Sequence, residues 1–433
     1  MRRAVIFDLD GTLTQSEEGI YNCVRHAAET MGYPVPDPET LRRFIGPPLY
    51  YSFRKYMGMS DGQADEAVRI YRERYVKKGL FENSVYPGIR RLLRMLKARG
   101  DYVAVATGKP QRPSERILRY FGLSAYIDRI VGPSEDVKSA DKESLIRRAL
   151  PADHEEAWMV GDRKFDVKGA RHAGVRSIGV GYGYGSEAEL REAGCDAYAP
   201  DVESLIQMLC PGMSAPHGTF LSMEGLDGSG KSTQLRALVE TLHRFGYEVV
   251  ETREPGGCRI SEKIRELLLS RENVGMTEET EALLYAASRA QHVHDTILPV
   301  VESGRICLSD RFLDSSVAYQ GGGRELGVQE VMDINAHAVH GLRPDITVFL
   351  ELPHDVALRR RYGASEPDRM EMEGDAFHAR VEQAYREMLR REPERFVVVD
   401  ASESAETISQ KIADRVLTRL MEREGIQWEK ELS

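Results

Sequence analysis

The stretch FLSMEGLDGSGKSTQL, residues 220–235, decides the fold of the second half of the chain. A short apolar run leads into a glycine-rich turn, GLDGSGKS at 225–232, which fits the pattern GxxxxGK[ST]. Glycines let backbone N–H groups turn inward around phosphate oxygens. Lys231 adds positive charge there, and the hydroxyl of Ser232 is a ligand for Mg²⁺. The stretch therefore predicts a strand, a phosphate-binding loop and a helix.

The helix predicted after this loop supports the interpretation over a chance glycine turn. Its apolar residues recur at helical spacing, and the positive end of a helix dipole favours bound phosphate. The apolar face consists of Leu235, Leu238, Val239, Leu242 and Phe245. The predicted ATP-binding residues are Gly225, Leu226, Asp227, Gly228, Ser229, Gly230, Lys231, Ser232 and Thr233.

The composition indicates more than one domain and no nucleic-acid partner. A chain of 433 residues is long for one domain and predicts two or three. The net charge of −10 makes a broad basic surface for nucleic acid improbable, although a local basic pocket for phosphate is compatible with it. We therefore expect small-molecule substrates.

The cysteines and the apolar runs predict a cytoplasmic protein with no membrane partner. The five cysteines are scattered and show no CxxC spacing, which favours a reducing compartment over disulfides or a zinc site. The first apolar run, AVIF at 4–7, is too short for a signal sequence, and no run reaches 18 apolar residues.

Apolar strand-like runs alternate with amphipathic helical stretches along most of the chain. This alternation predicts two doubly wound parallel-sheet α/β domains, with helices on both faces of each sheet. Residues 15–84 contain no clear strand and predict a helical cap inserted into the first domain. The interval LCPGMSAPHG is rich in proline, glycine and small residues and predicts a linker. The predicted organisation is a first domain at 1–210 (core 1–14 and 85–210, cap 15–84), a linker at 211–217 and a second domain at 218–433.

Four further motifs follow the phosphate-binding loop in order. They are TREPGG (252–257), LLYAASRAQH (283–292), DRFLDSSVAYQGGGREL (310–326) and DRMEMEGDAFHARVEQAY (368–385). Together they resemble the thymidylate kinase family over about 217–425. The resemblance implies a P-loop nucleoside monophosphate kinase fold, transfer of a phosphoryl group from ATP to dTMP with Mg²⁺, and a homodimer through this half.

The resemblance also implies a set of dTMP-binding residues: Asp227, Arg253, Glu254, Pro255, Tyr285, Arg289, Arg311, Ser315, Tyr319 and Gln320. Arg253 and Arg311 match binders of the acceptor phosphate, because phosphoryl transfer needs positioning and charge neutralisation. Tyr285 matches the aromatic residue that stacks on thymine, and Arg289 matches the arginine at the base edge.

Three acidic residues match positions near the sugar, the phosphates and the metal. Asp227 matches a carboxylate that holds the sugar 3′-OH, and Glu254 matches an acid near the acceptor phosphate. Asp310 ends an apolar strand and is expected near Mg²⁺ together with Ser232. A tyrosine beneath C2′ of the sugar, matched by Tyr319, would disfavour a ribonucleotide.

The basic stretch RRRYGASEPDR, residues 359–369, resembles the lid that closes over ATP. Family members without an arginine in the P-loop supply the transition-state cation from the lid, and this P-loop has none. The sequence leaves the choice open between Arg361 and Arg369. Two positions depart from the family pattern: Cys258, where threonine is common, and Ser288, which we expect to pack near the base and to affect its selection.

The first half carries a cluster of acidic residues in VIFDLDGTLT (5–14) and GDRKFD (161–166). Asp8 and Asp162 each follow an apolar run, and Asp10 lies two residues after Asp8, on the same side of an extended chain. Thr107 ends a further run, YVAVAT. Because ligands bind at the carboxyl ends of strands in open α/β sheets, we expect these residues to meet.

This set resembles the haloacid dehalogenase superfamily of phosphatases. The resemblance implies a Rossmann-like core in which Asp8 forms an aspartyl-phosphate and Asp10 acts as general acid and base. Thr107 would bind the phosphoryl group, and Lys142 would pair with its charge, with Lys138 as the alternative lysine. The implied Mg²⁺ ligands are Asp8, Asp10 through its carbonyl, and Asp162, with Asp166 in support. The family often has asparagine where this chain has Gly108.

The motifs leave the substrate of this first half open. The stretch from 161 to 190 and FIGPPL (44–49) look like the phosphoglycolate phosphatase and 5′-nucleotidase branch. Hydrolysis of dTMP would oppose the second half, so we expect a different small phosphoester. The alternatives are a kinase with a catalytically silent phosphatase-like scaffold, and a P-loop signalling NTPase, which would need no thymidine pocket.

Overall fold

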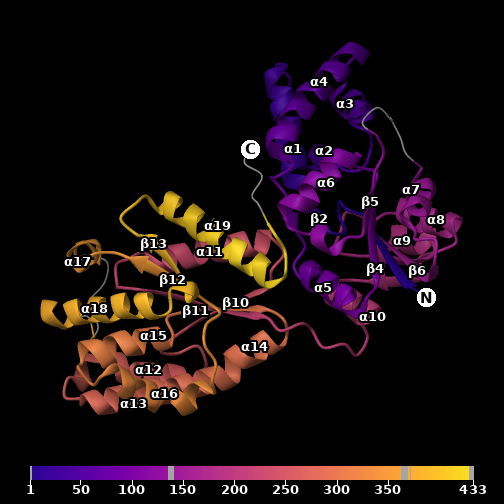
Figure 1. The fold of residues 1–433 in the computed structure, drawn as a ribbon. Coiled ribbons are helices and arrows are strands. Elements are labelled where there is room, and N and C mark those ends of the chain that lie inside the picture. The colour runs from indigo at the N-terminus through magenta and orange to yellow at the C-terminus, as the bar shows by residue number, and fades with distance from the viewer. Residues whose placement is uncertain (1, 135–140, 362–368, 371, 429–433) are drawn as a thin grey trace. The chain divides into compact units, whose positions relative to one another are not determined.

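The computed structural model describes residues 2–134, 141–361, 369–370 and 372–428. The chain forms two compact units (Figure 1), the first consisting mainly of Met1–Met213 and the second mainly of Ser214–Leu242 and Glu248–Gly425. The boundary between the two units, at Met213 and Ser214, falls within the interval 211–217 that the sequence predicts to be a linker. Both units are α/β, as the alternating runs predict.

The first unit is built on a six-stranded sheet in the order β5-β4-β1-β6-β7-β8, in which all paired strands are parallel. Its strands are β1 (Arg2–Phe7), β4 (Tyr102–Ala106), β5 (Arg129–Val131), β6 (His154–Gly161), β7 (Arg176–Val180) and β8 (Ala197–Ala199). Residues 4–7 are fully buried because helices cover both faces of the sheet. Ile6 pairs with Ala104 on one side and with Met159 on the other.

Helices connect these strands and cover the sheet. They are α5 (Ile89–Arg99), α6 (Gln111–Tyr120), the 3₁₀ helix η2 (Ser124–Tyr126), α7 (Lys142–Ala149), α8 (Lys164–Ala173), α9 (Glu187–Ala193) and α10 (Val202–Leu209). The strand order changes direction at β1, so the carboxyl ends of β1, β4 and β6 form the switch point at which such sheets bind ligands.

The insertion expected at 15–84 is helical. Its elements are α1 (Glu17–Thr30), α2 (Pro38–Arg42), α3 (Leu49–Met57), α4 (Asp61–Arg74) and the π-helical turn η1 (Tyr75–Gly79). Two short strands that the sequence did not predict, β2 (Thr14–Gln15) and β3 (Ser84–Val85), pair antiparallel where the chain leaves the core and returns to it. This pairing ties the two ends of the cap together above the carboxyl end of β1.

The second unit contains a five-stranded parallel sheet in the order β10-β11-β9-β12-β13. Its strands are β9 (Thr219–Gly225), β10 (Val249–Arg253), β11 (Ile306–Asp310), β12 (Ile346–Glu351) and β13 (Phe396–Asp400). In Figure 1, α11 and α19 lie on one face of this sheet, and α12, α13 and α16 lie on the other. Phe220, Cys307 and Phe312 contribute to a core cluster on the second of these faces.

Its helices include several long continuous stretches in which π-helical turns interrupt α-helix. They are α11 (Lys231–Arg244), α12 (Arg259–Leu269), η3 (Arg271–Asn273), α13 (Glu278–His292), η4 (Val293–Ile297), α14 (Leu298–Glu302), α15 (Leu313–Ser316), η5 (Val317–Gly323), α16 (Val328–Val339), α17 (His354–Arg361), α18 (Asp375–Arg391), η6 (Pro393–Arg395) and α19 (Ala405–Arg423). π-Helical turns are frequent at functional sites, and η5 carries two residues of the predicted dTMP site.

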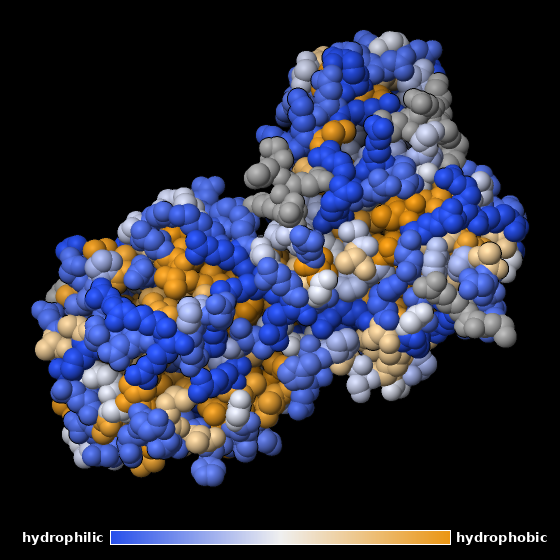
Figure 2. All heavy atoms as spheres, in the orientation of Figure 1, coloured by the Kyte–Doolittle hydropathy of each residue, from blue (hydrophilic) through white to orange (hydrophobic). Residues whose placement is uncertain are grey.

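Hydrophilic residues cover most of the face seen in Figure 2, with smaller hydrophobic areas on each unit. Among the residues that the model describes, no helix combines the length and the apolar character that a membrane span requires.

Candidate active sites

The glycine-rich loop of the second unit joins β9 to α11 as the sequence predicts. Gly228 and Gly230 adopt φ angles of 85° and 92°, in the left-handed region that favours glycine. A Cβ atom at Gly228 would lie 2.3 Å from the carbonyl oxygen of Ala357, so a larger residue does not fit there. Lys231 Nζ donates to the carbonyl oxygens of Gly225 and Leu226, each at 3.0 Å. Burial and the charge of a neighbouring arginine lower the pKa of Lys231.

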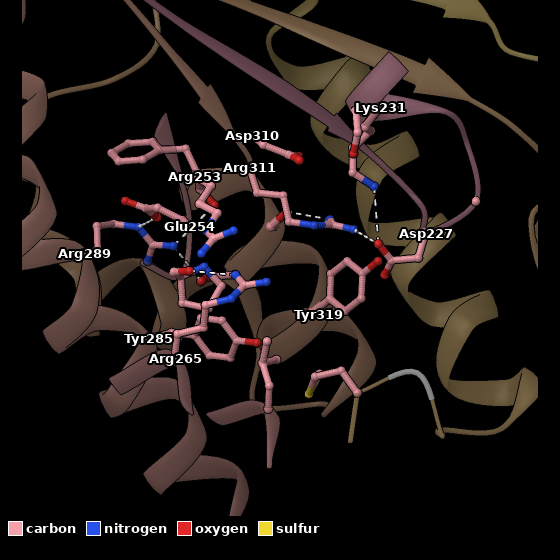
Figure 3. A pocket seen from close by; sticks show the side chains of 18 of the residues that line it. Asp227, Lys231, Arg253, Glu254, Arg265, Tyr285, Arg289, Asp310, Arg311 and Tyr319 are labelled. Atoms are coloured by element: carbon pink, nitrogen blue, oxygen red, sulfur yellow. Dashed lines mark hydrogen bonds and ion pairs between the residues drawn. The ribbon is translucent and has the colours of Figure 1, made fainter. Parts of the chain in front are cut away.

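A pocket of about 570 Å³ opens beside this loop (Figure 3). Its lining residues are Asp227, Gly228, Gly230, Lys231, Ser232, Thr233, Arg253, Glu254, Pro255, Arg265, Leu269, Tyr285, Arg289, Asp310, Arg311, Phe312, Ser315, Ser316, Tyr319, Gln320, Arg360 and Met370. All ten residues of the predicted dTMP set are among them. The structure therefore brings together, in one cavity, residues from seven separate stretches of the sequence.

Arg311 is held at the centre of the pocket in a strained backbone conformation. Its φ is 70°, which is uncommon for residues other than glycine. Backbone strain of this kind occurs most often at functional sites. Nη2 donates to Asp227 Oδ1 at 2.6 Å, and Nη1 donates to Ser315 Oγ at 3.0 Å. The guanidinium also lies 5.2 Å from the ring centroid of Tyr319. Burial lowers the pKa of Arg311, but Asp227, Tyr319, Tyr385 and Asp310 together outweigh it, and the net pKa is raised.

Glu224, on β9, supports Arg311 from below the pocket. Its carboxylate accepts hydrogen bonds from Phe312 N at 2.8 Å, from Ser315 Oγ at 2.6 Å and from the Tyr385 hydroxyl at 2.9 Å. Complete burial raises the pKa of Glu224 to about 7. Sequence reasoning missed this residue, because an acidic residue inside an apolar strand has no local signal for its partners.

Asp310 and Ser232 are suited to hold Mg²⁺ beside the loop. The Oδ1 atom of Asp310 is buried and has no hydrogen-bond partner among the described residues. Carboxylate and hydroxyl oxygens are ligands that Mg²⁺ prefers, and both side chains line the pocket. The residues present therefore fit the metal that phosphoryl transfer requires.

Arg253 and Arg265 lie at the outer end of the pocket. Arg253 is half exposed and donates from Nη2 to Glu262 Oε2 at 2.9 Å. Arg265 donates from Nη1 to the carbonyl oxygen of Pro255 at 2.7 Å. Arg265 was not predicted, although its position three residues after Glu262 places both on one face of α12.

Of the two arginines predicted from the lid, the structure describes the side chain of Arg369. Arg361 ends α17, and its side chain lies outside the described residues. Arg369 is buried, donates from Nε to the carbonyl oxygen of Leu268 at 2.9 Å, and lies 2.7 Å from Glu281 Oε2 through Nη1. Among the described residues, the lining of the pocket includes Arg360, which was not predicted, and does not include Arg369. The structure therefore does not bring Arg369 to the P-loop.

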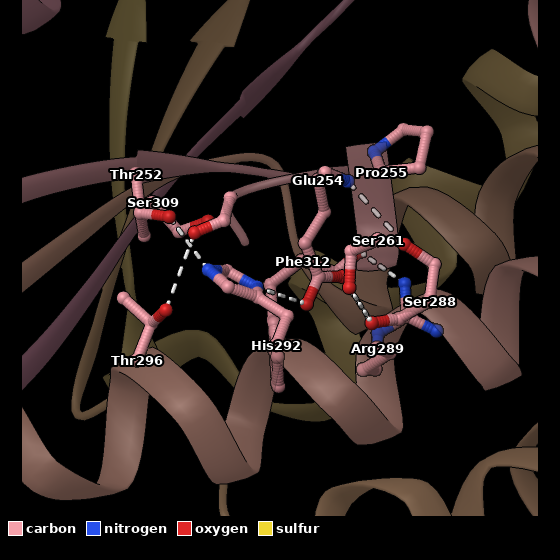
Figure 4. A network of polar contacts seen from close by, with 12 residues as sticks. Thr252, Glu254, Pro255, Ser261, Ser288, Arg289, His292, Thr296, Ser309 and Phe312 are labelled. Atoms are coloured by element: carbon pink, nitrogen blue, oxygen red, sulfur yellow. Dashed lines mark hydrogen bonds and ion pairs between the residues drawn. The ribbon is translucent and has the colours of Figure 1, made fainter. Parts of the chain in front are cut away.

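Arg289 lines the pocket and is buried within a polar network (Figure 4). Its Nε donates to Glu254 Oε2 at 2.8 Å, and its Nη2 donates to Ser316 Oγ at 2.9 Å. Nη1 donates to Asn335 Oδ1. The other oxygen of Glu254, Oε1, lies 2.9 Å from His292 Nδ1. Glu254 was expected near the acceptor phosphate, whereas both of its oxygens are engaged in holding Arg289 and His292.

Ser288 was expected to pack near the base. It is buried, and its Oγ accepts a hydrogen bond from Gly256 N at 3.3 Å, while its carbonyl oxygen accepts one from Ser261 Oγ at 2.7 Å. Among the described residues, it is not part of the pocket lining. Ser288 therefore packs α13 against the turn after β10.

The first unit gathers Asp8, Asp162 and Asp166 at the carboxyl ends of β1 and β6. One oxygen from each lies within 4.8 Å of the others. Lys142 Nζ lies between them, 2.8 Å from Asp8 Oδ1 and 2.6 Å from Asp166 Oδ1. Burial lowers the pKa of Lys142, but these two carboxylates outweigh it and raise the net pKa. Lys138, the alternative lysine, lies outside the described residues.

This acidic cluster fits Mg²⁺. Burial raises the pKa of Asp162 to about 7, and the charges of Asp166 and Asp8 add to the effect. Asp162 Oδ1 is buried and has no hydrogen-bond partner among the described residues, while Oδ2 accepts one from Tyr184 N at 2.7 Å. A divalent cation would relieve the mutual repulsion of these carboxylates. Gly11 is required beside the cluster, because its φ is 81° and a Cβ atom there would lie 2.3 Å from Asp162 Oδ2.

Asp10 is held by a lysine that sequence reasoning missed. Lys109 Nζ lies 2.9 Å from Asp10 Oδ2 and also donates to the hydroxyl of Tyr75, from the cap. Thr107, at the end of β4, is buried, and its Oγ1 accepts a hydrogen bond from Lys109 N at 3.2 Å. Lys109 follows Thr107 and Gly108 directly. Both of those residues were considered from the sequence, whereas no role was assigned to the lysine.

Comparisons with known proteins agree with both halves. Residues 223–412 match the thymidylate kinase family, and residues 5–180 match the haloacid dehalogenase-like hydrolase family. A thymidylate kinase of Pelobacter propionicus is 47% identical over 206 residues, covering 46% of this chain and 94% of that protein. One of an Exiguobacterium species is 44% identical over 205 residues, covering 47% and 97%.

The first half is similar to solved structures of hydrolases. A predicted phosphatase from Clostridium acetobutylicum is 41% identical, with a TM-score of 0.44, and the match covers 48% of this chain and 98% of that chain. Residues 5–180 match a haloacid dehalogenase-like hydrolase, and the second half is 47% identical to nearly the full length of a thymidylate kinase. The chain therefore belongs to the thymidylate kinase family and carries a haloacid dehalogenase-like hydrolase domain in its first half.

Proposed function

We propose that residues 218–433 transfer a phosphoryl group from ATP to dTMP, which yields ADP and dTDP. The observation that carries this proposal is the single pocket in which the P-loop meets the complete predicted dTMP set. The names of the relatives support the choice of thymidylate. A signalling NTPase would have no use for the base-end residues Tyr285, Arg289 and Gln320.

In the proposed mechanism, the chain binds two anionic substrates end to end. Lys231 and the loop N–H groups bind the ATP phosphates, while Arg253, Arg265 and Arg311 bind the acceptor phosphate. An oxygen of that phosphate attacks the γ-phosphorus, the bond from the γ-phosphorus to the bridging oxygen breaks, and ADP leaves. Mg²⁺ held by Ser232 and Asp310 would neutralise charge on the ATP phosphates.

The base and sugar are selected at the inner end of the pocket. Tyr285 stacks on the thymine ring, and Arg289 donates to its edge. Tyr319 lies over the Arg311 guanidinium, where a ring beneath C2′ leaves no room for a ribose hydroxyl. Asp227, which is bonded to Arg311, accepts a hydrogen bond from the 3′-OH.

We propose further that residues 1–210 hydrolyse a small phosphomonoester. Asp8 attacks phosphorus and forms an aspartyl-phosphate, the ester bond breaks, and Asp10 gives its proton to the leaving alkoxide. Asp10 then takes a proton from the water that attacks the aspartyl-phosphate and releases inorganic phosphate. Lys142 and Thr107 balance and orient the phosphoryl group. Mg²⁺ held by Asp8, Asp162 and the Asp10 carbonyl, with Asp166 in support, would screen the repulsion between carboxylate and phosphate.

The intact chain and an Asp8→Asn variant, both with Mg²⁺, test the two activities together. We expect phosphate release from at least one ester in a panel containing dTMP, dUMP and phosphoglycolate, lost in the variant, and ATP-dependent dTDP formation in both proteins. Faster hydrolysis of dTMP than of every other ester would contradict the expectation that the first half acts on a phosphoester other than dTMP. No release from any ester, with dTDP formation intact, would favour a catalytically silent scaffold domain.

We also propose that the protein is cytoplasmic and forms a homodimer through residues 218–433. This proposal rests on the resemblance to thymidylate kinases and on the scattered cysteines, all five of which are free. Light scattering of the intact chain at micromolar concentration is expected to give twice the 48.8 kDa mass of one chain. A monomer at that concentration would contradict the dimer.

A further inference from the structure

His292 has no role in the binding and transfer steps described so far, yet it is completely buried beside the pocket. It is the last residue of α13, and its ring lies between the end of β10 and the turn that follows it (Figure 4). Nε2 lies 2.6 Å from Thr252 Oγ1, and Nδ1 lies 2.9 Å from Glu254 Oε1. Among the described residues, His292 is not part of the pocket lining. Any effect it has on substrate must therefore pass through a neighbour.

The hydrogen bonds of this network converge on the carboxylate of Glu254. A carboxylate accepts only, so the atom of His292 that faces Glu254 carries the proton and donates it. The other ring nitrogen, Nε2, is hydrogen-bonded to the hydroxyl of Thr252. On its other side, Glu254 accepts from Arg289 Nε at 2.8 Å. The result is a continuous chain of donors and acceptors from Thr252 to Arg289.

This chain reaches the base end of the pocket. Arg289 lines the cavity, and its remaining hydrogen bonds go from Nη1 to Asn335 and from Nη2 to Ser316 and the Phe312 carbonyl oxygen. The carboxylate of Glu254 accepts a hydrogen bond from Arg289 Nε and so fixes the orientation of that edge of the guanidinium. Without a donor at Oε1, the Glu254 carboxylate would be free to rotate, and Arg289 would lose the orientation of that edge.

We propose that His292, oriented by Thr252, is a specificity-determining positioning residue that holds Glu254 so that Arg289 presents its donors to the substrate base. The inference rests on the proposed kinase function. Thymine presents an acceptor, O4, where cytosine presents an amino donor. A fixed arginine at that edge favours thymine, so the readout is the preference for dTMP over dCMP.

Two variants of His292 separate the two ring nitrogens. In His292→Asn, the amide nitrogen stands near the position of Nδ1 and retains a donor for Glu254. In His292→Gln, the amide group stands near the position of Nε2 and faces Thr252 instead. We expect His292→Gln to raise KM for dTMP about tenfold and to reduce the dTMP preference by a similar factor, with KM for ATP within about twofold of wild type. His292→Asn is expected to stay within about threefold of wild type.

A Thr252→Val variant retains the imidazole of His292 and removes the hydroxyl that is hydrogen-bonded to its Nε2. It therefore provides a second test of the proposal if His292→Gln does not fold. We expect it to shift the dTMP preference in the same direction by a smaller factor. Equal kinetics for the Asn and Gln variants would overturn the proposal. So would losses of equal size for dTMP, dCMP and ATP, since these would show a general structural defect.

Calorimetric binding of dTMP and dCMP to wild type separates this inference from the proposed function. Binding of dTMP without turnover would contradict the kinase reaction, while the variants would still test the base preference. Wild type that binds both nucleotides equally would overturn the inference even if dTDP is formed. Failure to bind dTMP at all would overturn both.

Discussion

The two candidate sites occupy the same kind of place, the carboxyl ends of parallel strands, yet they carry opposite charge. In the first unit, three carboxylates lie within 4.8 Å of one another, with Lys142 between two of them. In the second, five arginines and a lysine line one pocket, namely Lys231, Arg253, Arg265, Arg289, Arg311 and Arg360. The difference follows from the proposed reactions. A carboxylate nucleophile must be shielded from an anionic phosphate by a cation, whereas a site that holds two phosphate-bearing substrates must supply the cations itself.

The buried lysines of the two sites show the same contrast. Lys142 is bonded to two carboxylates, which raise its pKa, whereas Lys231 is bonded to backbone carbonyl oxygens, and burial lowers its pKa. Lys231 has its two shorter contacts with neutral carbonyl oxygens and a longer one, 3.4 Å, with Asp227 Oδ1, so its charge is less fully compensated and is available to an incoming phosphate. A lysine held by two acids instead stabilises the cluster that surrounds it. The predictions below test whether the two sites act as these environments indicate.

The largest expected effect is a reciprocal loss of activity. Asp8→Asn should lower phosphate release by at least about 10³-fold, because it removes the nucleophile, while dTDP formation stays within twofold. Lys231→Met should lower dTDP formation by a similar factor and leave phosphate release unchanged. Both rates can be measured on the same protein samples. Loss of both activities in either variant would show that the sites are not independent.

The pH dependence of stability tests the buried acid beneath the pocket. Glu224 has its pKa raised from 4.5 to about 7, which corresponds to about 3 kcal/mol at most. The folded state favours the protonated form, so this group's contribution to stability is fully present below pH 4.5 and is lost as pH rises towards 7. Glu224→Gln should therefore become more stable relative to wild type across this window.

The measurement is calorimetric unfolding between pH 4 and pH 8, followed on the transition that dTMP shifts upward. Asp314 lies close enough to Glu224 to contribute to its shift, so a parallel series in Asp314→Asn separates the two acids. A difference between wild type and Glu224→Gln that does not change with pH would contradict the raised pKa.

Arg265 should contribute to binding of the acceptor phosphate, which the sequence did not predict. Arg265→Ala is expected to raise KM for dTMP about tenfold, because one charged contact to phosphate is lost, and to leave KM for ATP unchanged. Arg386→Ala is the matched control, since Arg386 forms an exposed ion pair with Glu382 on α18 that contributes little. An equal rise for ATP would place Arg265 outside the acceptor site.

The smallest expected effect concerns the cap of the first unit. Tyr75→Phe removes the hydroxyl that accepts from Lys109 and should lower kcat/KM for phosphate release about threefold, because Lys109 also holds Asp10. Tyr51→Phe is the control, since the Tyr51 hydroxyl accepts from Lys55 at 2.8 Å on the exposed face of α3. Equal kcat/KM values for the two variants would show that the contact between Tyr75 and Lys109 does not affect phosphate release.

Local sequence predicted those parts of the sites in which neighbouring residues act together. The glycine-rich loop at 225–232 and the pair Asp8 and Asp10 depend on backbone turns that a few residues specify. The dTMP set was predicted through the resemblance, and the ten residues line one pocket. Residues 15–84, expected to be helical because they contain no clear strand, form helices between the short strands β2 and β3.

The partners of the functional side chains were not predictable in this way. Lys109 reaches Asp10 across 99 positions, and the hydrogen bond between Glu224 and Tyr385 joins residues 161 positions apart. Ser288 and Arg369 were placed near the base and the P-loop, but the structure packs both into neighbouring elements. Residue type alone does not indicate which of several nearby groups a side chain will contact.

The amino-acid sequence by itself determined two α/β units, the loop that binds phosphate, and the carboxylates that end the first strand of the chain. Strand periodicity, turn glycines and charged residues at strand ends act over a few positions, and a sequence displays them directly. Only the tertiary structure decided that Lys142 lies between two acids, that His292 supports Glu254, and that Arg265 joins the pocket. The reason is physical, because these contacts form between elements that packing brings together, and a buried polar group bonds with whatever partner the fold places within reach.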